Sequence, residues 1–156
     1  MKIDDLAYLD ASIDKDYEAL KDDLSSDLVI DDMSLDSESL NTPKLYSKYL
    51  FKYTESLNKL RKIQDIHAKI KLERWKYYVG KQSTAYYKEH GQVHDKILKT
   101  DIDMYLNADD YVVAISAIYD KQKRLCDMLE KSLKEINQRS YHIKSVIEWR
   151  KFESGC

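Results

Sequence analysis

Neither glycine nor a second proline interrupts the segment PKLYSKYLFKYTESLNKLRKIQDIHAKIKLERWKYYV, residues 43–79. Asn41 and Thr42 are polar capping residues just before Pro43, and proline is favoured in the first turn of a helix. Gly80, the first residue after the segment, is the residue type that most often ends a helix. We therefore predict one continuous helix over residues 43–79, about 55 Å long.

Apolar and aromatic residues recur at spacings of three and four along this predicted helix, which is the period of an amphipathic helix. The stripe consists of Tyr46, Tyr49, Leu50, Tyr53, Leu57, Leu60, Ile63, His67 and Ile70. A stripe of this length has to be buried against other helices or against other copies of the chain.

The C-terminal half predicts a second long helix, because it contains neither glycine nor proline between Gln92 and Ser154. The expected elements are a loop at 82–92, a short helix at 93–107 and a long helix from Asn107 or Asp109 to Phe152. The inward face of the long helix comprises Ile115, Ile118, Leu125, Leu129, Ile136, Ile143 and Ile147. These residues follow one another at spacings of three, four or seven, which are typical of a coiled-coil seam. The predicted fold is all-α, with long helices in an elongated antiparallel helical or coiled-coil arrangement.

The composition supports this fold class. Three glycines and one proline in 156 residues are too few for a fold rich in tight β-turns. No segment approaches the roughly 20 apolar residues of a membrane span, and the acidic N-terminus is unlike a secretory signal. Two cysteines, Cys126 and Cys156, provide neither a disulfide framework nor metal-ligand spacing, so we expect a reducing, cytoplasmic setting. Cys126 falls in the apolar stripe and is expected in the core.

The net charge of −2 conceals a strong segregation of charge along the chain. Residues 1–40 carry 13 acidic and 3 basic side chains, whereas residues 41–81 carry 3 acidic and 11 basic ones. We divide the chain into an acidic helical arm with a connector (1–42), a basic helix and loop (43–92), and C-terminal helices (93–156). Residues 1–27 are expected to be helical, and the segment 28–43 is expected to be a connector. The arm could be a solvated tail, or it could mimic DNA by lying over the basic helix or on a basic partner.

Cations and aromatic rings alternate at the end of the first long helix, in AKIKLERWKYYVGKQ, residues 68–82. Cations neutralise phosphates, and aromatic rings stack on unpaired bases, so the combination favours single-stranded nucleic acid. The candidate binding residues are Lys69, Lys71, Arg74, Lys76, Tyr77, Tyr78 and Lys81, with Trp75, Tyr86 and Tyr87 as further aromatic residues. The opposing interpretation is a solvated charged face with the aromatic residues in the core.

Catalytic patterns are weak. The chain has no phosphate-binding GxxxxGK[ST] loop, no GxGxxG and no GxSxG. His90 and His94 are four residues apart and could hold a metal, but Gly91 lies between them, and surface histidines are the simpler interpretation. Asp101 and Asp103 are more simply solvated carboxylates. We predict no metal, no cofactor and no enzymatic activity, and keep a metal-dependent hydrolase only as an alternative to test.

Three stretches resemble a known family. LYSKY (45–49), ERWKYYVG (73–80) and the tail IKSVIEWRKFESGC (143–156) are similar to the UvsY family, the recombination mediators of T-even-type bacteriophages. Arg74, Tyr77, Tyr78 and Gly80 match the family's Lys-x-Arg-x-x-Tyr-Tyr-x-Gly pattern. Leu72 stands at the position of the pattern's lysine, and Lys76 where relatives have an acid. The resemblance begins near residue 16, so residues 1–15 look like an extension.

The resemblance implies a function without catalysis in the cytoplasm of an infected bacterial host. Family members form hexameric or heptameric rings, bind single-stranded DNA, and contact a RecA-like recombinase (UvsX) and the phage single-strand-binding protein. They help the recombinase load onto strands that this protein already coats. We predict that the tail assembles the ring through Leu129, Ile136, Ile143, Ile147, Trp149 and Phe152. The alternative is a structural coiled-coil adaptor without a nucleic-acid role.

Overall fold

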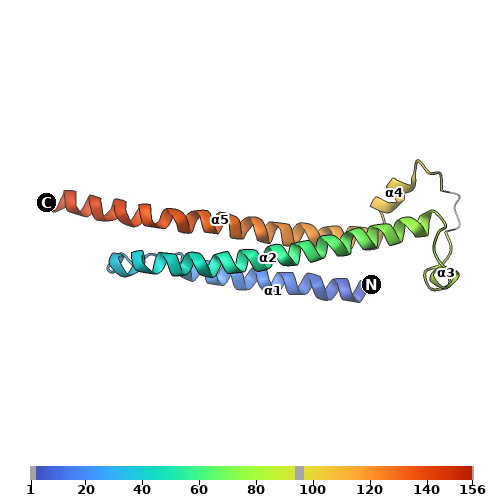
Figure 1. Cartoon of the computed structure of the whole chain (residues 1–156), viewed down its shortest axis with the longest axis horizontal. Coiled ribbons are helices and arrows are strands. Elements are labelled where there is room, and N and C mark those ends of the chain that lie inside the picture. Colours follow the sequence, from blue (N-terminus) through green and yellow to red (C-terminus); the bar gives the residue numbers. More distant parts are fainter. Residues whose placement is uncertain (1–2, 94–96, 156) are drawn as a thin grey trace. The chain divides into compact units, whose positions relative to one another are not determined.

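The computed structural model describes residues 3–93 and 97–155. These residues form five helices and no strand: α1 (Ile3–Asp27), α2 (Leu35–Tyr78), α3 (Thr84–His90), α4 (Ile102–Asn107) and α5 (Asp110–Glu153). Figure 1 shows the long helices α1, α2 and α5 and the short α3 and α4 between the end of α2 and the start of α5. The all-α prediction is confirmed.

The chain divides into two compact units. One unit comprises Met1–Ile13 and Lys59–Gln122, and the other comprises Asp14–Asn58 and Lys123–Cys156. We call them the loop-end unit and the tail unit. Each contains a part of α1, α2 and α5, so the three functional segments predicted along the sequence do not coincide with compact units.

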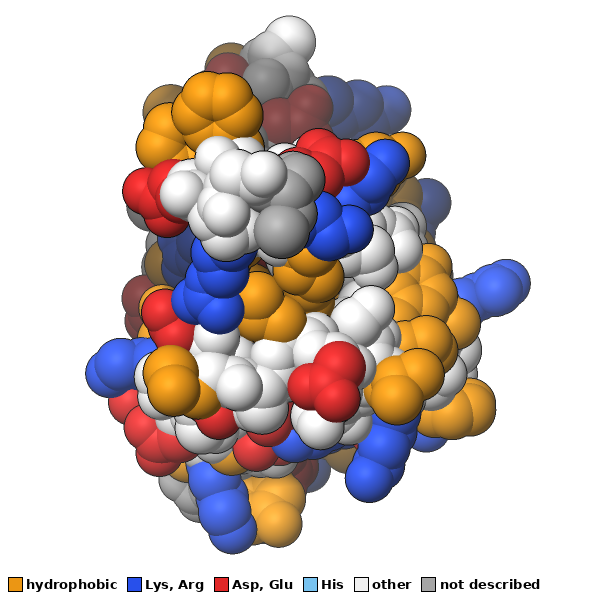
Figure 2. Space-filling view, turned by 90° about the vertical axis from the view of Figure 1, so that its left-hand side faces the viewer, with side chains coloured by type: hydrophobic (Ala, Val, Ile, Leu, Met, Phe, Trp, Pro, Cys, Tyr) orange, Lys and Arg blue, Asp and Glu red, His pale blue; other side chains and the backbone are white. Residues whose placement is uncertain are grey.

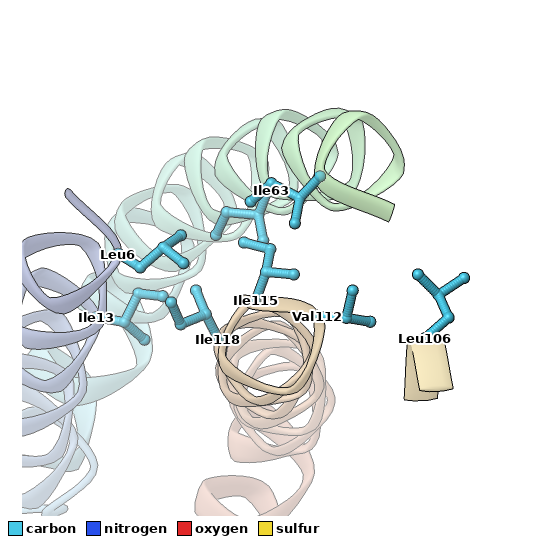
Figure 3. Close-up of a cluster of buried hydrophobic side chains, with 8 residues drawn as sticks. Leu6, Ile13, Ile63, Leu106, Val112, Ile115 and Ile118 are labelled. Carbon is cyan, nitrogen blue, oxygen red and sulfur yellow. The ribbon is translucent and has the colours of Figure 1, made fainter. Parts of the chain in front are cut away.

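In the loop-end unit, α2 runs antiparallel to α5. His67 Nε2 lies 3.0 Å from Ser116 Oγ, and further along the pair Arg74 contacts Asp109. The core of this unit consists of Leu6, Ile13, Ile63, Ile70, Leu106, Val112, Ile115 and Ile118. Figure 3 shows side chains of α1, α2 and α5 pointing toward one another in this cluster.

In the tail unit, the same three helices enclose a second core formed by Leu20, Leu45, Tyr49, Leu125, Leu129, Leu133 and Ile136. Ser56 Oγ lies 3.1 Å from the buried Cys126 Sγ, which confirms the prediction of a core cysteine. Cys156 lies outside the described residues. The stripe of α2 is buried at Tyr49 and Ile63, but Leu50 and Leu57 are each 40% exposed and were wrongly placed in the core.

Helix α2 begins eight residues earlier than predicted, at Leu35, and Pro43 lies inside it. A proline inside a helix removes one backbone hydrogen bond and is normally unfavourable. Here tertiary contacts hold the preceding turns, because Leu35 is buried and Glu38 pairs with the buried Arg139 of α5. The predicted connector therefore shortens to the residues between Asp27 and Leu35.

The loop predicted at 82–92 contains the short helix α3. Ser83 caps this helix by accepting a hydrogen bond from the backbone N–H of Tyr86, at 3.2 Å. Within the described part of the range 93–107, where one short helix is predicted, the helical residues are those of α4, Ile102–Asn107. The long C-terminal helix is confirmed, and its cap is Asp109, one of the two residues predicted for that role.

The acidic N-terminal segment forms one helix, α1, whose first part packs in the loop-end unit and whose second part packs in the tail unit. It is therefore not a solvated tail. Leu6, Ile13 and Leu20 bury one face of α1. Asp10 pairs with Lys121 at 2.6 Å in the loop-end unit, and Asp27 pairs with Lys48 at 2.7 Å in the tail unit. None of the described helices combines the length and the apolar composition needed to cross a membrane.

Candidate nucleic-acid interface

The C-terminal end of α2 is closed by a glycine turn. Gly80 has φ +75°, a left-handed conformation that glycine adopts without a steric penalty. The Lys81 N–H donates to the Lys76 carbonyl at 2.8 Å and the Gly80 N–H to the Tyr77 carbonyl at 3.3 Å. This pair of bonds is the Schellman arrangement, and it fixes the direction in which the chain leaves the predicted binding segment.

A buried ion pair joins α2 to the first turn of α5. Arg74 Nε and Nη2 each lie 2.7 Å from Asp109 Oδ2, and the Asp109 side chain is only 2% exposed. The other oxygen, Oδ1, accepts the backbone N–H groups of Tyr111 and Val112 at 3.1 and 3.3 Å. Asp109 therefore neutralises Arg74 and caps α5 with the same carboxylate.

Tyrosines surround the Arg74 guanidinium. Its Cζ lies 4.4, 5.0 and 5.7 Å from the ring centroids of Tyr77, Tyr111 and Tyr78. Arg74 Nη1 donates to Tyr86 Oη at 3.2 Å. Cation–π contacts of this kind are strongest where water is excluded. We call Arg74, Asp109 and these four tyrosines the arginine–tyrosine cluster.

Burial and hydrogen bonding set the charges in this cluster. Burial alone would lower the pKa of Arg74, but the hydrogen bonds to Asp109 and Tyr86 outweigh it, so the pKa is raised and the guanidinium stays charged. Burial and the hydrogen bond to Asp109 raise the pKa of Tyr78 to about 12. Tyr78 Oη therefore remains protonated and donates to Asp109 Oδ2 at 2.8 Å.

The structure divides the predicted binding residues into two groups. Lys69, Lys71, Lys76 and Lys81 are exposed, whereas Arg74 is buried and Tyr77 and Tyr78 are half-buried. Direct phosphate contact by Arg74 would require breaking its pair with Asp109. Tyr77 also packs against Tyr87, with ring centroids 5.6 Å apart, so aromatic neighbours from the chain itself hold this ring in place.

An exposed row of lysines follows the outer side of α2 in the loop-end unit. Lys62, Lys69 and Lys76 are exposed and seven residues apart, so they form one line along the helix. We call these three residues the lysine row. Successive members rise about 10 Å along the axis. Lys62 was missed because the basic-aromatic pattern starts after it, although the spacing of seven could have revealed it. Lys71, two residues after Lys69, points to another side of α2.

The residues predicted for oligomerisation also divide into two groups. Leu129, Ile136 and Ile143 are buried inside the chain's own tail unit, so they are not available to a second copy. Ile147, Trp149 and Phe152 are exposed by 36%, 61% and 76%. Figure 2 views the molecule from the side at which α5 ends and shows hydrophobic side chains on that surface.

The histidine-based metal hypothesis gains no geometric support in the described part of the chain. His90 Nδ1 lies 3.1 Å from the Tyr86 carbonyl oxygen, and the two rings stack with centroids 4.1 Å apart. His94 lies outside the described residues. Among residues 3–93 and 97–155, no group of three or more histidine, cysteine or acidic side chains could hold a metal ion.

A family model described as "Recombination, repair and ssDNA binding protein UvsY" matches residues 23–156. The chain belongs to the UvsY family. The resemblance predicted from LYSKY, ERWKYYVG and the tail is thereby confirmed. The match begins within the last turns of α1, so most of that helix lies outside it.

The chain is similar to UvsY proteins of bacteriophage T4. "Recombination protein uvsY" of Enterobacteria phage T4 is 28% identical over 139 residues, which cover 88% of this chain and 97% of the relative. Two crystal structures of the bacteriophage T4 recombination mediator protein UvsY, in lattice types II and I, each give a TM-score of 0.77 at 26% identity. They cover 88% and 86% of this chain, and 96% and 98% of those chains.

Leu72, between Lys69 and Lys76, interrupts the exposed lysine row. It is 53% exposed and stands three residues after Lys69 and four before Lys76. On a helix, such spacings place its side chain next to both lysines. An apolar residue thus occupies a place where a cation would extend the row.

Proposed function

We propose that this chain is a recombination mediator that binds single-stranded DNA as a homo-oligomer and acts without catalysis. It promotes loading of a RecA-like phage recombinase (UvsX) onto strands coated by the phage single-strand-binding protein. The setting is phage homologous recombination, repair and recombination-dependent replication in the cytoplasm of the infected host. Membership of the UvsY family supports this proposal, and the surface of α2 supplies its chemistry.

The lysine row is the observation that carries the proposal. Three lysines face solvent along one line of α2, and Lys81 adds a fourth exposed lysine just beyond the helix end. Each cation that neutralises a phosphate releases condensed counterions, which favours binding and makes it sensitive to salt. The arginine–tyrosine cluster beneath this surface holds α2 against α5 and so keeps the row in place.

An oligomer of the chain would bind a strand more tightly than a single subunit. One subunit offers only a few cations, whereas an oligomer joins many such rows and raises their effective concentration along one strand. Ile147, Trp149 and Phe152, on the last turns of α5, are the apolar surface that we assign to subunit contact. In the proposed hexameric or heptameric ring, residues 43–92 bind the strand and residues 93–156 assemble the subunits.

The DNA-binding step is tested by replacing two members of the row. Lys69→Ala with Lys76→Ala should weaken binding of fluorescent oligo-dT and lower the slope of log affinity against log salt by about 0.7 for each lost contact. Lys123→Ala with Lys131→Ala is the matched control, because both lysines are exposed on α5 in the tail unit. An equal loss in both variants would remove the row from the proposal. No binding of the wild type at micromolar protein would favour the adaptor function.

The mediator step needs a separate assay. A recombinase filament should form faster on a strand coated with single-strand-binding protein when this chain is present. The Lys69→Ala, Lys76→Ala variant should give less acceleration, and the lysine control should match the wild type. Equal filament formation with and without the chain would limit the function to DNA binding.

A further inference from the structure

A pocket of about 320 Å³ lies beside the end of α2 in the loop-end unit. Its aromatic wall consists of Tyr77, Tyr78 and Tyr87, and the remaining lining residues are Val79, Gly80, Gln92 and Val93. This volume is at the lower end of the roughly 300–1,000 Å³ of small-molecule sites, so it suits one small planar group. The sequence pattern around residues 68–82 did not reveal the pocket, because α3 supplies one of its walls.

Hydrogen bonds hold the pocket's wall in place. Tyr87 Oη donates to the Tyr77 carbonyl at 3.0 Å, and the Gln82 N–H donates to the same hydroxyl at 3.4 Å. Gln82 Nε2 also donates to the Glu73 carbonyl at 2.9 Å, which ties the turn back onto α2. The pocket is therefore built by the glycine turn and α3, two rigidly connected pieces of backbone.

Gly80 leaves space open at the pocket's edge. An added Cβ at Gly80 would meet no atom within 4 Å, and the positive φ of this residue disfavours any side chain there. Gln92 adds an amide with two donor hydrogens and one acceptor oxygen.

Exposed lysines adjoin this aromatic and polar surface in the sequence. Lys76 precedes Tyr77, and Lys81 follows Gly80; a backbone hydrogen bond of 2.8 Å joins the two lysines. A ligand that suits both parts carries negative charge next to a flat ring with hydrogen-bonding edges. A nucleotide of an unpaired strand has this chemistry, since its phosphate can meet lysine while its base meets aromatic and amide groups.

We propose that this pocket takes a single unpaired base of the bound strand while Lys76 and Lys81 hold the adjacent phosphates. The inference rests on the proposed function and adds to it a contact with the base itself. Each subunit would remove one base from the stack at the end of its lysine row. The occupant is a base within a strand, because a free mononucleotide would forgo the phosphate contacts made along the row.

The test compares two oligonucleotides of equal length, oligo-dT and an oligomer that is abasic at every position. Both carry the same phosphates, so their affinity ratio isolates the contribution of the bases. For the wild type we expect oligo-dT to bind at least about fivefold more tightly, the lower limit for one stacked base. Fluorescence anisotropy at two salt concentrations measures both affinities and their salt dependence, and excess dTMP should not displace oligo-dT.

Two variants test whether the affinity ratio depends on the pocket. Val79→Trp should fill the pocket and bring the ratio close to one, whereas Gln92→Ala should lower the ratio without adding bulk. Val113→Trp is the matched control, because Val113 is 51% exposed on α5 and is absent from the pocket lining. It should keep the wild-type ratio. Circular dichroism checks that each variant is folded, and the alanine variant keeps the test decisive if tryptophan at position 79 prevents folding.

The outcomes separate the pocket from the wider function. Salt-sensitive binding of both oligonucleotides with equal affinity would overturn the base pocket and leave the proposed function standing. A high ratio that persists in both pocket variants would place the base contacts elsewhere and also overturn the inference. Displacement by dTMP would show a mononucleotide site instead. No binding of either oligonucleotide would refute the proposed function, and the pocket assignment would fail with it.

Discussion

Replacing Asp109 with serine separates the two roles of this side chain. Serine caps a helix about as well as aspartate, so Asp109→Ser should preserve the start of α5. It removes the carboxylate and leaves the guanidinium of Arg74 buried without its ion-pair partner. Breaking a buried pair by removing one partner costs about 3–5 kcal/mol. Asp109→Ala should lose the cap as well, which adds about 1 kcal/mol.

These losses are large against the roughly 5–15 kcal/mol that stabilises a typical folded domain. Urea unfolding followed by circular dichroism, at one fixed protein concentration, measures the free energy of unfolding of each variant. Asp110→Ser is the control, because Asp110 is an exposed carboxylate at the next position and its loss should change stability by at most about 0.5 kcal/mol. A loss below about 1 kcal/mol in Asp109→Ser would refute the structural role assigned to the pair.

A double variant tests whether Arg74 and Asp109 stabilise each other. Arg74→Met with Asp109→Ser removes both charges and keeps the cap. Replacing a complete buried pair by apolar or neutral groups is often close to neutral. The double variant should therefore be more stable than Asp109→Ser alone, and the two substitutions should not be additive. Additive losses would show that the two side chains do not stabilise each other.

Further predictions concern the row, the tail and the tyrosines. Leu72→Lys should extend the lysine row, so affinity for oligo-dT should rise at low salt and the salt slope should steepen by about 0.7; an unchanged slope would contradict this. Trp149→Ala with Phe152→Ala should lower the mass measured by light scattering without loss of helicity, whereas a wild-type mass near 18.5 kDa at every concentration would rule out the oligomer. The raised pKa of Tyr78 favours its neutral form in the folded chain, so its contribution to stability is complete below pH 10 and is lost as the pH rises toward 12. Tyr78→Phe should flatten that loss in urea unfolding at pH 9–12, and an equally steep loss would assign it to other groups.

The helices were predictable because few residues interrupt them. Gly80 indicated the end of α2, and the capping residue Asp109 was one of the two starts predicted for α5. The start of α2 was not predictable, since the local preference of Pro43 for a first turn favours a helix beginning there. Contacts with α5, more than 90 residues away in sequence, override that preference. Local sequence contains no information about such contacts.

The position of Arg74 could have been predicted from periodicity. Ile63, His67 and Ile70 belong to the apolar stripe, and Arg74 lies four residues further along the same side of the helix. Its charge suggested an exposed side chain, although the spacing indicated a buried one. The partner, Asp109, could not be predicted in the same way, because the register between α2 and α5 in the loop-end unit is set by tertiary packing and not by local sequence.

Substitution of Arg74 and substitution of the lysine row should have opposite effects on stability and on the salt dependence of DNA binding. A phosphate contact by Arg74 would first have to release it from Asp109, at a cost of about 3–5 kcal/mol in every subunit, whereas an exposed lysine needs no such release. Arg74→Met should therefore lower the free energy of unfolding but leave the salt slope of the folded protein unchanged. Lys69→Ala with Lys76→Ala should lower the salt slope but leave stability within about 0.5 kcal/mol of the wild type. If Arg74→Met instead reduced the slope by about 0.7 with stability intact, the strand would be held by Arg74 itself, and the pair with Asp109 would have to open whenever DNA binds.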